Sequence, residues 1–409
     1  SVMHSKLSAG ERFDQYTRAK KGEIDVMIGP RSALFTPFEN LGLIVIDEEH
    51  DTSYQSEMPP KYHAREVAIQ RAKMVGASVV LGSATPSVDS YYKALKGEYR
   101  LFELNERAGN AVYPKIYIED LREELKARNY SIFSRKLDEL MRDRLEKKEQ
   151  IMLFLNRRGF AGFVSCRQCG EVVGCPHCSV ALKPHMAGDR VSYLMCHYCG
   201  YKMPMPDKCP ECGSPYISSF GIGTEQVEQM VKKRFSAAKV LRMDADTTTG
   251  KNAHQDILKK YSGGDADILI GTQMIVKGHD FANVTLVGIL AADLSLNVGD
   301  YLAAEKTFQL TTQACGRAGR ADKPGEVVIQ TYQPEHYSIV CAARNDYKSF
   351  YEQEILIREM LQYPPISNIL GVLVLSENES SVDNLAKILA DKMKLYHDVT
   401  VLGPTPAAI

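Results

Sequence analysis

Short apolar runs alternate with longer amphipathic stretches along most of the 409-residue chain. Such runs predict buried parallel strands, and the amphipathic stretches predict the helices that join them. In the first part of the chain, the predicted strands are Ile24–Gly29, Leu41–Ile46 and Ala77–Leu81, with a helix over Tyr62–Met74. This alternation is typical of an α/β lobe with a parallel sheet.

A second α/β series follows a charged, mixed stretch over Leu101–Tyr130, which we interpret as the connection between two lobes. Its predicted strands are Gln150–Asn156, Lys239–Met243, Ala266–Gly271, Val284–Ala291 and Glu326–Thr331. Helices fit between these strands at Thr224–Phe235 and Ala303–Ala314. The fold class predicted is therefore α/β, with two lobes that each contain a parallel sheet.

The pattern also sets the expected domain boundaries. They are a first lobe over 1–108, a connection over 109–147, a second lobe over 148–163 and 217–341, an inserted module over 164–216, and a C-terminal part over 342–409. In the last part we expect strands at Leu370–Leu375 and Thr400–Leu402 around a helix at Val382–Tyr396, which indicates a partial α+β domain.

The charge and hydropathy of the chain narrow the possible partners. The formal net charge is −1, so there is no overall basic character, and any nucleic-acid contact must use local patches. No apolar run approaches the roughly 20 residues that span a bilayer, and no signal peptide is visible at the start. We therefore expect no membrane partner.

Eight of the ten cysteines form four Cys-x-x-Cys pairs within 47 residues. The pairs are Cys166/Cys169, Cys175/Cys178, Cys196/Cys199 and Cys209/Cys212. In a mixed-charge chain of cytosolic character, such pairs favour zinc over disulfides. The surrounding segment is poor in periodic apolar residues, so metal would have to hold it together.

The spacing favours one assignment of the pairs to two zinc ions. Seventeen residues separate Cys178 from Cys196, which suits a zinc ribbon made by the two central pairs, and the two outer pairs would form the other site. A sequential assignment, the first two pairs and then the last two, stays open as the alternative. Four thiolates leave no open position on the metal, so both sites are predicted to be structural.

Acidic residues end the apolar strand of the first lobe. Asp47, Glu48 and His50 belong to the string Asp-Glu-Glu-His. Acids at the carboxyl end of a buried strand are typical of phosphoryl-transfer sites. We expect Asp47 to hold Mg²⁺ through its water shell and Glu48 to orient the water that attacks ATP.

Two further strings fit the same chemistry. Ser83 and Thr85, in Ser-Ala-Thr, follow the next strand and could link the state of the nucleotide to lobe movement. Gln313, Arg317 and Arg320 stand at the end of a helix in the second lobe. Arginines three residues apart would share a helical face, and guanidinium suits the charge of a γ-phosphate.

Together these strings resemble the superfamily 2 helicases, and the inserted cysteine module makes the chain similar to the primosomal replication-restart helicases, the PriA family. The resemblance extends over nearly the whole chain. It also covers Gly271-Thr272-Gln273-Met274, the following Lys277–Phe281 and Leu155–Gly159. It implies that the two α/β lobes are RecA-like and that Gly278 and Asp280 couple to the nucleotide.

One departure from this family is large, because the chain has no Gly-x-x-x-x-Gly-Lys-Ser/Thr phosphate loop. In the family, that loop lies just upstream of a segment similar to Met3-His4-Ser5. We therefore expect a motor-core fragment with an incomplete first lobe, which is inactive on its own because tight ATP binding needs the loop's amides and lysine.

Candidate DNA contacts follow the strands or the acidic string. Basic and hydroxyl or amide residues after strands suit phosphates, and tyrosines can stack on bases without sequence preference. The candidates are Arg31, Ser32, Tyr54, Tyr62, Arg65, Arg157, Arg158, Thr272 and Gln273.

The resemblance implies an ATP-dependent 3′→5′ DNA helicase of the bacterial cytoplasm that restarts replication at stalled forks. It further implies Mg²⁺ and ATP as cofactors beside two Zn²⁺. The implied partners are single-stranded and forked DNA, primosome proteins and single-stranded DNA-binding protein. Two alternatives stay open: a zinc-dependent, non-catalytic DNA or protein scaffold, and another superfamily 2 translocase.

Overall fold

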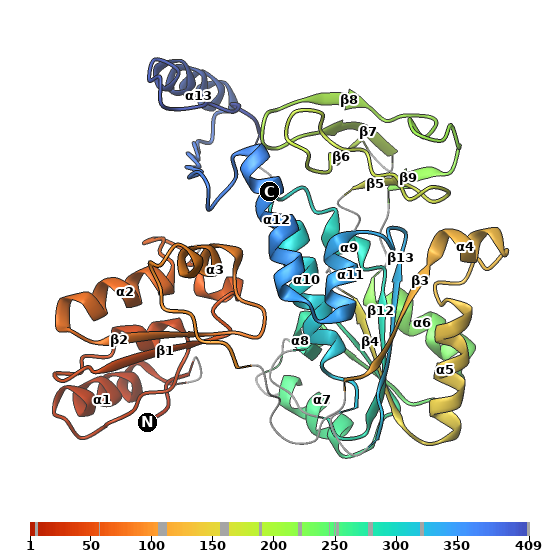
Figure 1. Ribbon diagram of the computed structural model, residues 1–409, viewed down its shortest axis with the longest axis horizontal. Helices are drawn as coiled ribbons and strands as arrows, with labels where there is room; N and C mark the ends of the chain where they lie inside the picture. The colour runs from red at the N-terminus through yellow and green to blue at the C-terminus, as the bar shows by residue number, and fades with distance from the viewer. Residues whose placement is uncertain are drawn as a thin grey trace. The chain divides into compact units, whose positions relative to one another are not determined.

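The computed structural model describes residues 1–4, 7–56, 58–104, 113–155, 163–187, 190–219, 223–244, 246–248, 250, 253–276, 281–319 and 323–406. The chain divides into two compact units, Ser1–Leu101 and Phe102–Ile409. Figure 1 shows the helices and strands of each unit.

The first unit contains a two-stranded parallel sheet with helices. β1 (Leu43–Asp47) pairs in parallel with β2 (Ser78–Gly82), so the polar residues that follow both strands lie at the same end of the sheet. The chain between them forms α2 (Ala64–Val75), which ends at Gly76 with a φ of 72°. The other elements are α1 (Ala9–Lys20), η1 (Arg31–Phe35), η2 (Thr52–Tyr54) and α3 (Val88–Leu95).

The strand predicted over Ile24–Gly29 is wrong. Of these residues, Ile28 makes a single parallel bridge with Val2, and the segment is otherwise irregular. A strand needs a continuous partner for its hydrogen bonds, and the apolar pattern alone cannot supply one.

A six-stranded parallel sheet forms the centre of the second unit, in the order β10-β11-β4-β12-β13-β3. Its strands are β3 (Lys115–Asp120), β4 (Gln150–Leu155), β10 (Val240–Met243), β11 (Ile268–Gly271), β12 (Val284–Leu290) and β13 (Glu326–Thr331). Five of these strands match the second predicted series within one or two residues.

Helices cover both faces of this sheet, as expected for a RecA-like lobe (Figure 1). Met152 and Phe154 of β4 pack on one side, while Leu153 and Leu155 pack on the other. The first side is covered by α7 (Ala253–Ser262), α8 (Gln273–Val276), α10 (Ala303–Cys315) and α11 (Tyr337–Arg344). The second side is covered by α5 (Arg135–Glu146) and α6 (Thr224–Arg234).

The range 109–147, predicted to be a connection, contributes to the second lobe. β3 pairs with β13 along its whole length, and α5 buries Leu137 and Met141 against the sheet. β3 and α5 are joined through α4 (Leu121–Lys126). Charged residues hid this role, because an edge strand is half exposed and shows no continuous apolar run.

The cysteine module is inserted between β4 and α6, as predicted. β5 (Val164–Cys166) pairs with β9 (Ile217–Ser219), and β6 (Lys183–Ala187), β7 (Arg190–Met195) and β8 (Lys202–Pro204) form a second antiparallel sheet. Its buried cluster is small and contains cysteines beside a few aliphatic side chains such as Leu182 and Leu194. Metal therefore has to supply much of the stability.

The C-terminal part of the described chain is helical. It contains α12 (Tyr347–Leu361) and α13 (Glu379–Met393). The short α9 (Asp293–Leu296) belongs to the second lobe, between β12 and α10. The strands predicted at Leu370–Leu375 and Thr400–Leu402 do not form, and Leu370 and Leu375 are each 80% exposed. None of the described helices is long and apolar enough to cross a bilayer.

Candidate functional sites

The acidic end of β1 and the Ser-Ala-Thr turn after β2 are brought together by the parallel pairing of the two strands. His50 Nδ1 lies 2.7 Å from Ser83 Oγ, and the backbone N–H of Glu49 donates to the Gly82 carbonyl over 3.1 Å. Ser83 Oγ also accepts a hydrogen bond from the Thr85 N–H. The geometry therefore connects the two strings that the sequence predicted to act together.

Glu48 has an exposed side chain and a left-handed backbone. Its φ is 47°, an unfavourable conformation for a residue with a Cβ. The turn is held by the Asp47 carboxylate, which accepts from the Glu48 N–H over 2.9 Å, and by the Asp51 N–H, which donates to the Glu48 carbonyl. The Glu48 side chain is 48% exposed, so its carboxylate is accessible to water.

Glu49 is a residue whose role sequence reasoning missed. It is 2% exposed, and its carboxylate accepts hydrogen bonds from the Ser87 N–H over 2.6 Å and from Ser90 Oγ over 2.9 Å. The third carboxylate of the string thus ties the end of β1 to the start of α3. The signal available in the sequence was the pair Ser87 and Ser90, because serines are frequent at helix starts, where free N–H groups need partners.

The predicted DNA contact at Arg65 is corrected by its surroundings. Its side chain is 11% exposed, and its guanidinium pairs with Glu49 over 3.3 Å and with Asp89. It also donates to Ser90 Oγ over 2.6 Å. A guanidinium paired in this way is not available to a phosphate, so we assign Arg65 to the internal network of the first unit.

The other predicted DNA contacts of the first unit surround the loop after β1. Arg31 donates to the carbonyls of Ser53 and Gln55 over 2.8 and 2.6 Å. The Tyr54 hydroxyl donates to the Asp47 carbonyl over 2.8 Å, which links this loop directly to the acidic strand end. Tyr62 packs edge-on against Phe35, and Ser32 is exposed.

In the second unit, the described candidate residues lie in two places, after β11 and at the end of α10. Thr272 is buried directly after β11, and the exposed Gln273 begins α8. Gln313 lies in the last turn of α10, which ends at Cys315. Arg317 follows in a turn after the helix, and its expected helical face shared with Arg320 involves a residue outside the described part of the chain. Arg157, Arg158, Gly278, Asp280 and Arg320 lie outside the described residues.

A cavity of about 540 Å³ lies between the cysteine module and the second lobe. Gln273 and Lys306 line it from the lobe, and Lys183, His197 and Tyr198 line it from the module. Lys183, the Gln273 amide and the Tyr198 ring suit a nucleic-acid strand, whereas Lys306 pairs with Asp300 in the same cavity.

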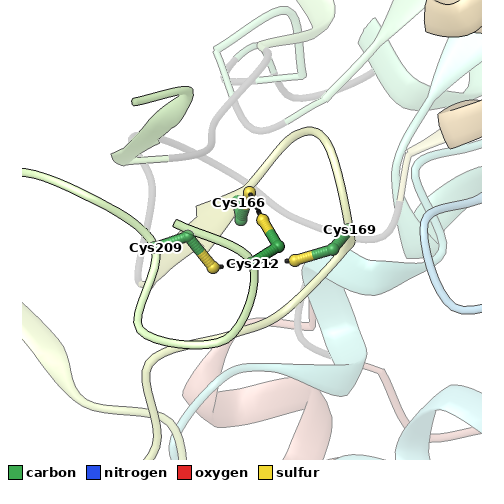
Figure 2. A group of neighbouring side chains, drawn as sticks. All are labelled: Cys166, Cys169, Cys209 and Cys212. Atoms are coloured by element: carbon green, nitrogen blue, oxygen red, sulfur yellow. Dashed lines mark hydrogen bonds between the residues drawn. The ribbon is translucent and has the colours of Figure 1, made fainter. Parts of the chain in front are cut away.

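Two clusters of four cysteines confirm the assignment that the spacing favoured. Cys166, Cys169, Cys209 and Cys212 form the outer site, drawn in Figure 2, and Cys175, Cys178, Cys196 and Cys199 form the central site. In each cluster the four sulfurs lie within 4.8 Å of one another. The sequential assignment is therefore excluded.

The sulfur spacing fits zinc rather than disulfides. The Sγ atoms of Cys166 and Cys212 are 3.7 Å apart, and those of Cys175 and Cys199 are 3.6 Å apart. A tetrahedral ion with Zn–S bonds of about 2.3 Å places its sulfurs about 3.8 Å apart, and a disulfide needs about 2.05 Å. The two clusters fit two structural zinc ions, and neither includes a histidine.

The four Cys-x-x-Cys loops repeat one backbone turn. In each loop, the residue four positions after the first cysteine donates its N–H to that cysteine's carbonyl over 2.9 to 3.1 Å. The four bonds run from Gly170 to Cys166, from Ser179 to Cys175, from Gly200 to Cys196 and from Gly213 to Cys209. All four closing residues have positive φ. Three glycines and a serine therefore stand where the turn requires a left-handed backbone.

Asp293, which follows β12, was also missed by sequence reasoning. Burial raises its pKa to about 6, and it accepts hydrogen bonds from Thr331 Oγ1 over 2.9 Å and from the Tyr332 N–H over 3.0 Å. An acid directly after an apolar strand was the available signal, the same one that identified Asp47. Here it fixes the chain after β13, where the cysteine module meets the lobe.

Comparisons with known proteins agree with these sites. The model described as "Helicase conserved C-terminal domain" matches residues 217–322, and "PriA DNA helicase Cys-rich region (CRR) domain" matches residues 175–204, which contain all four central cysteines. A likeness to the solved Lhr helicase of Mycobacterium smegmatis has a TM-score of 0.43 at 13% identity, over 97% of this chain and 40% of that one, and is too distant to support an argument.

The curated relatives are much closer. The chain is 48% identical to "Replication restart protein PriA" of Bacillus subtilis and 44% identical to the protein of that name from Synechocystis. Each match covers 100% of this chain but 51% and 50% of the relative. The chain therefore spans about half the length of the curated relatives it matches.

Proposed function

Because the chain belongs to the PriA family of replication restart proteins, we propose that it serves in an ATP-dependent DNA helicase. The proposed helicase moves 3′→5′, acts at stalled or branched forks, and loads the primosome so that replication resumes. Its proposed partners are single-stranded and forked DNA, the primosome proteins and single-stranded DNA-binding protein.

The hydrogen bond of 2.7 Å between His50 and Ser83 is the observation that supports this proposal most directly. It links an acidic strand end to a hydroxyl-rich turn in one unit, as a motor that converts a change at the nucleotide into movement requires. The Glu48 carboxylate lies 3.6 Å from His50 Nδ1, and its side chain is 48% exposed, so water can reach it and be oriented by it.

The remaining roles are assigned by the same proposal. Asp47 would hold Mg²⁺, which neutralises phosphate charge when bound, and Arg317 and Arg320 would stabilise the γ-phosphate. Ser83, Thr85, Gly278, Asp280 and Gln313 would couple the nucleotide to movement. Since the sequence has no Gly-x-x-x-x-Gly-Lys-Ser/Thr, we expect these 409 residues alone to show no ATP hydrolysis.

For DNA we retain the contacts predicted from the sequence, with the exception of Arg65. They are Arg31, Ser32, Tyr54, Tyr62, Arg157, Arg158, Thr272 and Gln273. The bond from Tyr54 to the Asp47 carbonyl supports a path by which DNA in this loop affects the acidic site. The cavity that contains Gln273 supports a nucleic-acid strand at the second lobe.

The test is ATP hydrolysis, with and without forked DNA, by a protein of the relatives' full length that contains these residues. We expect DNA to stimulate turnover, and Glu48→Gln to lower kcat about a hundredfold or more, because a neutral amide cannot accept the proton of the attacking water. KM for ATP should change little, since Glu48 would act on the water and not on ATP binding.

Glu98→Gln is the matched control, because it makes the same chemical change at an exposed position of the same unit. It should leave kcat unchanged. Equal turnover in the Glu48→Gln and Glu98→Gln proteins, or no response to DNA, would refute the proposed function.

A further inference from the structure

The central zinc site contacts the second lobe through both of its loops. The Tyr363 hydroxyl, just beyond α12, donates to the Cys178 carbonyl over 2.9 Å. Tyr198 stands between Cys196 and Cys199, and its hydroxyl accepts from the Tyr301 N–H over 3.3 Å and donates to Asp300 over 3.4 Å. One loop of the site is therefore held by Tyr363, and the other holds Asp300 and Tyr301.

Asp300 and Tyr301 lie directly before α10 and determine how that helix begins. The first position before α10, Leu302, makes no side-chain cap. Asp300 caps this end of the helix instead. Its carboxylate accepts a hydrogen bond from the Leu302 N–H over 3.1 Å and pairs with Lys306 in the first turn over 2.6 Å. A carboxylate at this end also suits the helix dipole.

Aromatic and ionic contacts join the two tyrosines to the same helix. Tyr301 stacks on Tyr363 with ring centroids 5.1 Å apart, and Arg358 lies over the Tyr301 ring at 5.4 Å. Arg358, whose side chain is 3% exposed, pairs with Glu305 of α10 over 2.6 Å and with Glu354 of α12 over 2.8 Å. A buried arginine with two carboxylates holds both helices in one arrangement.

The outer zinc site meets a different part of the lobe. Gly170, in its first loop, is packed against the backbone of Tyr332, and Gln333 Nε2 lies 3.4 Å from the Gly170 carbonyl. Tyr332 and Gln333 follow β13 and are distant in sequence from the start of α10. The two zinc sites therefore have separate contacts with the lobe.

We propose that the central zinc site positions α10, with Tyr198, Asp300 and Tyr363 as the positioning residues. Metal binding fixes the loops that carry the Cys178 carbonyl and Tyr198, and these loops fix the first turn of the helix. A helix of 13 residues transmits that placement over about 20 Å to its last turn. That turn contains Gln313 and precedes Arg317. The roles of these two residues at the nucleotide rest on the proposed function.

Hydrogen exchange by mass spectrometry tests this on the 409-residue chain with zinc bound. The double variant Tyr198→Phe/Tyr363→Phe removes only the two hydroxyls. We expect the amides of α10 to exchange roughly tenfold faster in this variant, because three hydrogen bonds are lost. Two join Tyr198 to Asp300 and Tyr301, just before the helix, and the third joins Tyr363 to the Cys178 carbonyl. Peptides from β4 and β11 should keep their protection, and one of the two zinc ions should pass faster to a chromophoric chelator.

Tyr216→Phe is the matched control, because Tyr216 is an exposed tyrosine in the module beside the outer site. It should change neither readout. A second pair of variants separates the sites: Cys196→Ser should raise exchange in α10, whereas Cys209→Ser should raise it around Tyr332 and Gln333. Unchanged exchange of α10 in the double tyrosine variant, or equal effects of the two cysteine variants on α10, would overturn the proposal.

These readouts need no nucleotide. Failure of the Glu48→Gln test would therefore leave a positive exchange result standing, and an unchanged α10 would leave the proposed helicase activity standing.

Discussion

The zinc module and the six-stranded sheet belong to the same unit, yet they are stabilised by different means. The sheet buries long apolar strands on both faces, with β4 and β12 fully buried along their length. The module has short strands and a small cluster in which cysteines replace much of the apolar core. One region depends on apolar area removed from water, and the other on metal–thiolate bonds.

The difference shows how each region can be destabilised. Apolar packing is distributed, so one substitution weakens the sheet by a limited amount. Each metal site depends on four ligands, so removal of one ion affects a whole set of loops at once. The following experiments separate the two regions, from the largest expected effect to the smallest.

Removal of zinc should give the largest effect, in the module and at the segments that contact it, α10 and the chain around Tyr332 and Gln333. After treatment with a strong chelator, residues 163–219 should lose most of their protection against hydrogen exchange. Peptides from β4, β11 and β12 should keep theirs, because their apolar contacts involve no metal. Loss of protection throughout the sheet would show that the two regions are not stabilised independently.

Phe154→Ala should produce the converse effect. Phe154 is 1% exposed in the core of the sheet, so its truncation should lower the free energy of unfolding of the lobe by about 3–5 kcal/mol. Zinc content, measured by elemental analysis, should stay at two ions per chain. Phe102→Ala is the control, because Phe102 is 72% exposed; it should change neither quantity.

Gly170→Ala should test the contact between the two regions. A Cβ at this position would lie 2.5 Å from the Tyr332 carbonyl oxygen, and φ is 82°. We expect a loss of about 1–3 kcal/mol in unfolding free energy, from overpacking and the left-handed backbone.

Gly213→Ala isolates the steric part of that effect. Its φ is 70°, but no atom lies within 4 Å of an added Cβ. If denaturant unfolding gave equal losses for the two variants, the close contact with Tyr332 would contribute nothing.

His336→Asn should give the smallest change in the unfolding free energy of the lobe that contains the six-stranded sheet. Burial lowers the pKa of His336 to about 4, so the folded state stays neutral while the unfolded state takes up a proton below its ordinary pKa. Stability from this group is therefore lost as the pH falls, by about 1 kcal/mol between pH 7 and 5.5.

Asparagine keeps the hydrogen-bond acceptor at the start of α11 but cannot titrate. The variant should lose less unfolding free energy than the parent over this pH range. Zinc release at low pH affects both proteins alike, so the difference between their denaturant curves reports His336. If the unfolding free energies of the variant and the parent changed equally with pH, His336 would not be the group responsible.

Much of the fold and of the sites was predictable because the responsible signals are local. Strands buried on both faces leave continuous apolar runs, and these located β4, β11 and β12. The cysteine spacing of two and 17 residues indicated the correct ligand sets, since a ribbon loop has a limited range of lengths. The acids that end β1 were visible because they break an apolar run.

The features that were missed depend on partners far away in the sequence. β3 became a strand only by pairing with β13, more than 200 residues later, and Leu370–Leu375 did not become one because the described chain gives it no partner. Arg65 carries a charge that suits a phosphate, but the fold placed Glu49 and Asp89 beside it.

The sequence by itself determined the α/β alternation, the inserted module and its eight zinc ligands, because backbone periodicity and ligand spacing act over short stretches of chain. Only the tertiary structure decided which carboxylates are buried and which loops of the module contact α10. Those outcomes depend on packing and charge pairing between distant segments, and a linear pattern does not specify which distant groups will meet.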